Sequence, residues 1–231
     1  MNIPKHIDVD QAVANVKSDD TIMVGGFGLV GSPLTMIDAL THWDVTNLTI
    51  ISNNVGETGK GLGILLQQGK LKKAVGSYFT SNREVAKWYN EGKLELDLLP
   101  QGTFAEAIRA GGAGIGGFYT KTAVGTELAQ GKETRDIDGE TYLLEKPLKA
   151  DVALIRAEKA DTKGNLVYYK TARNFNPIMA SAAAYVVAEV DEIVDEGELD
   201  PEAIATPHLF VDALVKSRYV LTKEGVVDRG R

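Results

Sequence analysis

Hydrophobic positions along the 231-residue chain follow two alternating patterns. Short, nearly continuous apolar runs are typical of strands buried on both faces of a sheet, whereas apolar residues that recur every three or four positions are typical of helices. The runs predict strands at Thr21–Gly25, Leu48–Ile51, Lys73–Tyr78, Leu94–Leu98, Val152–Ala157 and Tyr185–Val190. The helical spacing predicts helices at Val9–Val16, Pro33–Trp43, Gly61–Gln68, Asn82–Asn90, Phe104–Ala110 and Asn176–Ala184.

The alternation of strands and helices predicts the fold class. A helix between two strands allows a parallel crossover, so we expect an α/β fold with an open, mostly parallel sheet and helices on both faces. One segment departs from this pattern, because Asp138-Gly139 lies between alternating stretches and predicts a β-hairpin appended to the sheet. The sequence has no evident linker or repeat, so we expect a single domain over residues 1–231.

Composition narrows the possible functions. The net charge is −7 and no long basic run occurs, which argues against binding to nucleic acid or to an anionic membrane. The absence of cysteine excludes disulfides, thiolate zinc sites and cysteine nucleophiles. His6, His42 and His208 lack metal-ligand spacing, so we expect no metal site. The first residues do not resemble a targeting signal and no apolar run is long enough to span a bilayer, so we expect a cytoplasmic protein.

A glycine pattern separates the first long predicted strand from its helix. Gly26, Gly28 and Gly31 spell G-x-G-x-x-G, and we expect Ser32 to cap the helix and Pro33 to fit its first turn. Such a turn lets the backbone approach an anionic ligand, and the helix N-terminus adds unpaired N–H groups. Tight packing of the strand on the helix is an alternative role for the glycines.

The glycine pattern alone does not indicate a nicotinamide cofactor. A dinucleotide site also has an acidic residue about 20 positions on, at the end of the next strand, where it holds the ribose. Here the strand Leu48–Ile51 ends in Ser52-Asn53-Asn54. A phosphate or carboxylate ligand is therefore favoured over NAD.

Three side-chain amides follow predicted strands at the end where open α/β sheets bind ligands. Asn53 and Asn54 come after one strand, and Gln101 after another. Amides both donate and accept hydrogen bonds, so they suit carboxylates and carbonyls. Turn formation by the two asparagines, and a bond from Gln101 to loop backbone, are alternatives that stay open.

Several segments, in order, resemble the first of the two subunits of class I coenzyme A transferases. They are Ile22–Pro33, Ser52-Asn-Asn, Pro100-Gln-Gly-Thr, Arg109-Ala-Gly-Gly-Ala-Gly-Ile, Val124-Gly-Thr and Lys170-Thr-Ala-Arg-Asn-Phe-Asn-Pro177, followed by Glu198–Pro201 and Thr206-Pro207. The likeness covers nearly the whole chain. It is closest to the enzymes that move CoA between succinyl-CoA and a 3-oxoacid such as acetoacetate.

The resemblance implies covalent, ping-pong catalysis. A glutamate attacks the acyl-CoA thioester, which gives an acyl-glutamyl anhydride and free CoA thiolate. The thiolate then attacks the glutamyl carbonyl, which releases the first carboxylic acid as its carboxylate and leaves a glutamyl–CoA thioester. A second acid reverses the sequence. CoA is thus a substrate, and no permanently bound cofactor is expected. Acetate or butyrate as acceptor is the nearest alternative, and a non-catalytic ligand-sensing domain of the same architecture is a second one.

The resemblance also implies that the nucleophile lies elsewhere. In this family the glutamate belongs to a Glu-x-Gly motif of the second subunit. Glu57-Thr-Gly59 has the spacing but directly follows the Asn-Asn loop, and Glu196-Gly197 is typical of a surface turn. We therefore expect no catalytic nucleophile in this chain. We also expect a different CoA-transferase subunit as its partner, in an A2B2 assembly, and a bacterial source.

The resemblance assigns expected roles to two sets of residues. The acyl-CoA contacts are Gly25, Gly26, Phe27, Gly28, Leu29, Val30 and Gly31. The substrate contacts are Asn53, Asn54, Gln101, Gly112 and Gly114. Tyr168-Tyr169-Lys170 is a further candidate for a CoA phosphate, with a strand edge as the alternative. Ile115–Ala123 lacks two prolines of the family and His208 replaces a glycine, which leaves the acyl substrate open.

Overall fold

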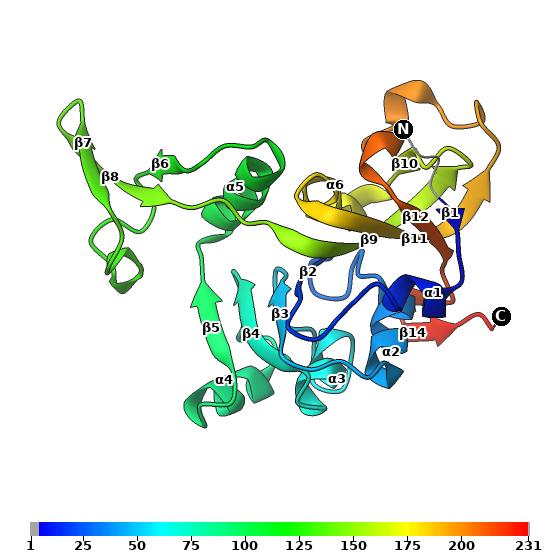
Figure 1. Cartoon of the computed structure of the whole chain (residues 1–231), viewed down its shortest axis with the longest axis horizontal. Helices are drawn as coiled ribbons and strands as arrows, with labels where there is room; N and C mark the ends of the chain where they lie inside the picture. The colour runs from blue at the N-terminus through cyan, green and yellow to red at the C-terminus, as the bar shows by residue number, and fades with distance from the viewer. Residues whose placement is uncertain (1–4, 231) are drawn as a thin grey trace.

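The computed structural model describes residues 5–230, which form an α/β fold around one large sheet (Figure 1). All pairs along the main strand order are parallel, and only β10 pairs antiparallel, with β9. In spatial order the strands are β1 (Lys5–His6), β12 (Ala213–Lys216), β11 (Ala183–Val194), β9 (Ala150–Asp161), β2 (Thr21–Val24), β3 (Leu48–Ile51), β4 (Leu71–Gly76) and β5 (Glu95–Leu98), with β10 (Leu166–Val167) beside β9.

Helices cover both faces of this sheet (Figure 1). One face carries α1 (Val9–Val13), α2 (Leu34–His42), α3 (Leu62–Gln67) and α4 (Arg83–Asn90), and the other carries α5 (Gln101–Gly112) and α6 (Asn176–Ala180). Successive residues of a strand alternate between the two faces. Ile22 and Val24 accordingly join the α1–α4 core, while Met23 joins the α5–α6 core. The predicted fold class is confirmed.

The N-terminus of α2 is capped differently from the prediction. Ser32 does not cap it, because Pro33 holds the N-cap position and makes no side-chain hydrogen bond. Instead, the buried Glu189 carboxylate on β11 accepts hydrogen bonds from the N–H groups of Thr35 at 3.0 Å and Met36 at 3.2 Å. A carboxylate suits this position because a helix N-terminus carries unpaired N–H groups and a partial positive charge.

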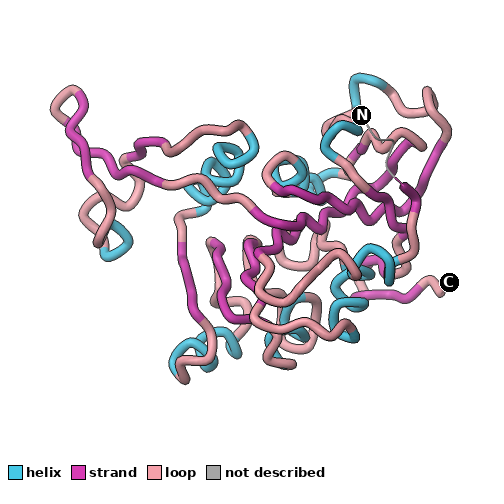
Figure 2. The backbone as a smooth tube through the Cα atoms, viewed as in Figure 1, coloured by secondary structure: helices cyan, strands magenta, loops and turns pink. Residues whose placement is uncertain are grey.

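Two small antiparallel sheets accompany the main one. The predicted hairpin is confirmed, with positive φ at both Asp138 (52°) and Gly139 (80°), as a two-residue turn requires. It does not extend the main sheet, but forms a separate one that projects from the body of the molecule (Figure 2). This sheet consists of β6 (Phe118–Thr120), β8 (Glu140–Glu145) and β7 (Thr134–Ile137), and a C-terminal hairpin consists of β13 (Tyr219–Thr222) and β14 (Gly225–Asp228).

Some predicted boundaries change in the structure. α5 begins at Gln101, so this residue is helical and does not lie in a loop. α6 ends at Ala180, because the chain enters the long strand β11 at Ala183. Short 3₁₀ turns complete the fold at η1 (Glu127–Ala129), η2 (Lys170–Arg173), η3 (Pro201–Ala203) and η4 (His208–Phe210). Within residues 5–230, no helix combines the length and apolar character that a membrane crossing demands.

Candidate functional site

The glycine pattern forms a tight turn between β2 and α2. Phe27 and Val30 close it with two backbone hydrogen bonds of 3.0 and 3.2 Å. Gly26, Gly28 and Gly31 have φ values of 124°, 61° and 71°, which other residues rarely adopt. The sequence therefore needs glycine here for backbone reasons, whatever the turn binds.

The space around Gly28 and Gly31 shows which glycine is needed for close packing and which one a ligand could approach. A Cβ on Gly31 would lie 2.4 Å from the carbonyl oxygen of Ala172, so this glycine allows close packing. A Cβ on Gly28 would meet nothing nearer than the Asn54 Nδ2, 4.0 Å away. The packing alternative thus holds for Gly31, whereas Gly28 faces open space beside the Asn53–Asn54 loop.

The turn keeps unpaired hydrogen-bond donors. Among the described atoms, the N–H groups of Gly28, Leu29 and Gly31 have no acceptor, whereas those of Phe27 and Val30 bond within the turn. Gly28 and Leu29 are consecutive, and neighbouring free N–H groups favour an anion or a developing oxyanion. The turn is therefore chemically suited to the predicted acyl-CoA contact, which stays a prediction.

Two asparagines from the segment 170–177 hold this turn. Asn174 accepts a hydrogen bond from the Gly26 N–H at 3.1 Å and donates one to the Val30 carbonyl at 3.0 Å. Asn176, fully buried, donates to the Gly31 carbonyl at 3.0 Å. The segment is recognisable in the sequence as a motif, but neither asparagine could be given a role there, since their partners lie almost 150 positions away.

The Asn53–Asn54 loop is buried next to the glycine turn. The Asn53 side chain donates to the Ser77 hydroxyl at 2.9 Å, and the Asn54 side chain accepts from the Gly56 N–H at 3.0 Å. The turn-forming alternative is thus observed for Asn54. Its Nδ2 remains the nearest atom to the open side of Gly28, so the structure brings these two predicted site segments together.

The structure does not bring Gln101 close to the other two predicted substrate contacts that follow it, Gly112 and Gly114. Gln101 is exposed at the first position of α5 and Gly112 is the last, so they lie about 16 Å apart along the helix. A Cβ on Gly112 would lie 2.2 Å from the Ser181 hydroxyl, which indicates a packing role, and Gly114 has open space around it. Near Gln101, the buried Thr103 hydroxyl has no partner among the described residues. The substrate contacts of all three predicted residues stay predictions.

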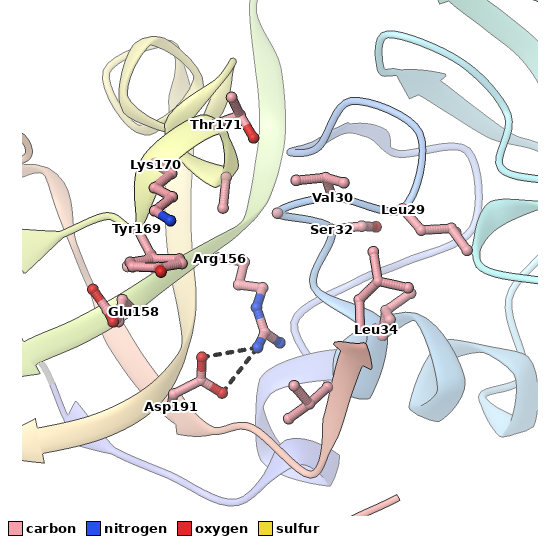
Figure 3. Close-up of a pocket in the computed structure, with 15 residues that line it drawn as sticks. Leu29, Val30, Ser32, Leu34, Arg156, Glu158, Tyr169, Lys170, Thr171 and Asp191 are labelled. Carbon is pink, nitrogen blue, oxygen red and sulfur yellow. Dashed lines mark hydrogen bonds and ion pairs between the residues drawn. The ribbon is translucent and has the colours of Figure 1, made fainter. Parts of the chain in front are cut away.

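A cavity of about 400 Å³ adjoins the glycine turn (Figure 3). Its walls come from the turn, from η2 and from β13. Tyr169 and Lys170 lie across the cavity from Leu29 and Val30, and the Lys170 Nζ lies 4.9 Å from the centre of the Tyr169 ring. Tyr168 instead is largely buried and bonds to another segment of the chain. Of the predicted phosphate contacts, the structure places Tyr169 and Lys170 near the turn.

A buried charge cluster supports the same cavity. The Nη2 of Arg156 donates to both carboxylate oxygens of Asp191, at 2.9 and 3.0 Å, and its Nη1 donates to Glu189 at 2.8 Å (Figure 3). Burial raises the pKa of Glu189, and the neighbouring Arg156 opposes this effect. Because Arg156 is already paired with two carboxylates, it acts as structural support and leaves no free positive charge for a ligand.

The two glutamates considered as nucleophiles lie on the surface. Glu57 pairs with Lys60 at 3.4 Å, and Glu196 pairs with Lys163. All four side chains are at least 42% exposed. These are the surroundings of solvated surface acids, in keeping with the expectation that the nucleophile comes from another chain.

The sequence profile described as Coenzyme A transferase matches residues 6–217. The chain belongs to this family. The first subunit of the succinyl-CoA:3-ketoacid coenzyme A transferase of Xanthomonas campestris pv. campestris (strain B100) is 52% identical over 212 residues, 91% of this chain and 88% of the relative. The first subunit of the 3-oxoadipate CoA-transferase of Pseudomonas putida is 50% identical over 209 residues, 90% of each chain.

A solved structure of a coenzyme A transferase has the same fold. The acyl-CoA transferase of E. coli O157:H7, in a thioester complex with CoA, matches with a TM-score of 0.81. The sequences are 22% identical, so this likeness supports the fold alone. The match covers 93% of this chain but 47% of the E. coli chain. The predicted family is confirmed over nearly the whole sequence.

Proposed function

We propose that this chain is the first subunit of a two-subunit 3-oxoacid CoA-transferase, which moves CoA between succinyl-CoA and a 3-oxoacid such as acetoacetate. The observation that carries the proposal is the 52% identity, over 91% of the chain, to a protein named for this reaction. The site supports it, because a turn with free N–H groups lies beside buried amides at the end of the parallel strands.

The chain contributes binding and orientation, and the partner subunit contributes the nucleophilic glutamate. Attack on the thioester, and attack of the CoA thiolate on the glutamyl carbonyl, both pass through tetrahedral oxyanions. Such oxyanions are stabilised by N–H groups that are held in place before the reaction. The free N–H groups of Gly28 and Leu29 are of this kind. CoA enters and leaves as a substrate.

The glycine turn is open to a partner. Phe27 is 49% exposed and Val30 is 38% exposed, although both are apolar and lie beside the site. An A2B2 assembly that brings the partner's nucleophilic glutamate to this turn would cover them. Gln101 and Asn54 then face the acyl group and Gly114 borders it, whereas Gly112 contributes through its packing against Ser181. The assembly works in the cytoplasm.

The test is reconstitution with the partner subunit, the expected product of a neighbouring gene. The purified complex is assayed with succinyl-CoA and a panel of acceptors: acetoacetate, 3-oxoadipate, acetate and butyrate. The proposal expects ping-pong kinetics and the highest kcat/KM with acetoacetate. A higher kcat/KM with acetate or butyrate would assign the chain to the short-chain type. No transfer with any acid would favour a non-catalytic ligand-binding role.

A further inference from the structure

The glycine turn needs an external support. Its glycines have more backbone freedom than other residues. Among the described residues, three local backbone hydrogen bonds brace it from within: two between Phe27 and Val30, and one from the Ser32 N–H to the Leu29 carbonyl at 3.2 Å. Free N–H groups favour a reaction only if they are held in place before the charge develops. Whatever holds the turn therefore affects the chemistry without touching the substrate.

Asn174 provides this support at both ends of the turn. Its Oδ1 accepts from the N–H of Gly26, and its Nδ2 donates to the carbonyl of Val30. The same side chain is fixed from behind, because Oδ1 also accepts from Phe175 at 2.7 Å and Nδ2 also donates to Thr171 at 3.0 Å. Its Oδ1 also accepts a bond from the Asn176 Nδ2 at 3.3 Å, so every hydrogen-bonding position of the amide is used.

These contacts leave the reactive face of the turn free. Asn174 uses the N–H of Gly26 and the carbonyl of Val30, and it leaves the N–H groups of Gly28 and Leu29 without a partner among the described residues. We infer that Asn174 is a positioning residue, which fixes these two N–H groups for the acyl-CoA substrate. The inference rests on the proposed function, since it gives the turn an acyl-CoA to bind.

Asn176 has a different role, although it stands two residues away. It is fully buried, and besides the turn it bonds to the N–H of Arg156 on β9, inside the sheet. Its loss would damage the core. Asn174 is only half-buried, so water can replace its amide when the side chain is shortened. The Asn174→Ala variant should therefore fold, which makes the inference testable.

The control is Asn165→Ala. Asn165 also accepts a backbone N–H bond, from His208 at 2.9 Å, and also donates to an oxygen, that of Asp161 at 2.7 Å. None of these partners belongs to the glycine turn. Each variant loses a bond accepted from a backbone N–H and a bond donated to an oxygen, but only Asn174→Ala releases the turn.

The experiment measures two quantities on the complex reconstituted with the partner subunit: amide hydrogen exchange over residues 25–31, and steady-state kinetics with succinyl-CoA and acetoacetate. For Asn174→Ala we expect faster exchange in the turn and a kcat about ten- to a hundredfold lower. The KM for succinyl-CoA should change much less. Asn165→Ala should change neither quantity.

Unchanged exchange in the turn, or kinetics equal to those of the control, would overturn the inference. Faster exchange with a normal kcat would overturn it as well, because the turn would then not need to be fixed for the reaction. An inactive wild-type complex would refute the proposed function instead, and the exchange measurement would still decide whether Asn174 holds the turn.

Discussion

At the scale of single residues, the glycines of the G-x-G-x-x-G pattern have different reasons to be glycine. The backbone requirement is readable from the sequence, since such turns use positive φ. What surrounds each glycine is not, because the neighbours are distant in sequence. Ala172 and Asn174 approach Gly31, and Asn54 lies across open space from Gly28.

Alanine substitutions test the difference between Gly31, which allows close packing, and Gly28, which faces open space. Gly28→Ala forces a side chain into the left-handed region and should cost about 1–2 kcal/mol of stability. Gly31→Ala adds a 2.4 Å approach to a backbone oxygen and should cost more. Urea unfolding of both variants checks this order. In the complex, Gly28→Ala should also lower acyl-CoA turnover at near-normal folding. Equal losses of stability would contradict the geometry.

Gln101 is the residue on which acceptor choice is predicted to depend. It is exposed at the first position of α5, where an acid can reach both the amide and the helix N-terminus. Losing one hydrogen bond to a charged group costs about 1.5–3 kcal/mol, which corresponds to about ten- to 150-fold in kcat/KM.

Gln101→Ala should therefore lower kcat/KM for a dicarboxylate or 3-oxoacid much more than for acetate. Kinetics of the complex over the acceptor panel measure the difference. Equal losses for every acid would mean that Gln101 serves the common thioester step or folding, and that it does not select the substrate.

At the scale of elements, α2 depends on a carboxylate that strand β11 supplies. Glu189 is fully buried and caps α2 while pairing with Arg156. Glu189→Gln places an N–H group among donors and removes the charge opposite Arg156. Breaking a buried ion pair costs about 3–5 kcal/mol, and the remaining Asp191 pair makes the lower end the expected value.

Chemical denaturation of Glu189→Gln and Glu192→Gln gives the comparison. Glu192 lies on the same strand but pairs with Lys159 on the surface, with exposures of 50% and 40%, so its loss should cost far less stability than the loss of Glu189. If both variants lost the same stability, the cap on α2 would have little energetic importance.

The main strands and helices could be predicted because their signals are local. Buried runs such as Leu48–Ile51 and spaced apolar residues such as those of α2 mark elements directly. Strands of two residues, such as β1 and β10, are too short to show a hydrophobic pattern in the sequence. The cap on α2 was missed for another reason, since Glu189 lies 154 positions from Thr35. The sequence signal that could have revealed this cap is Glu189 itself, an acidic residue within the apolar strand β11.

At the scale of the whole molecule, parallel topology assembles the site. Strands β2 and β3 are neighbours and run the same way, so the turns that follow them meet at one edge of the sheet. The sequence therefore sufficed to expect the glycine turn and the Asn53–Asn54 loop at the ligand-binding edge of the sheet, and the strand order in the structure makes them neighbours. It did not suffice for the asparagines of residues 174–176, because their position depends on how the chain returns after β10.

The central claim is that this chain is one half of an enzyme whose nucleophile lies on the partner. Intact-mass spectrometry of the reconstituted complex, quenched after mixing with succinyl-CoA and without an acceptor, tests it most directly. We expect a covalent CoA thioester adduct on the partner subunit, an unmodified mass for this chain, and no transfer by this chain alone. An adduct on this chain, at Glu57, Glu196 or any other residue, would contradict the claim.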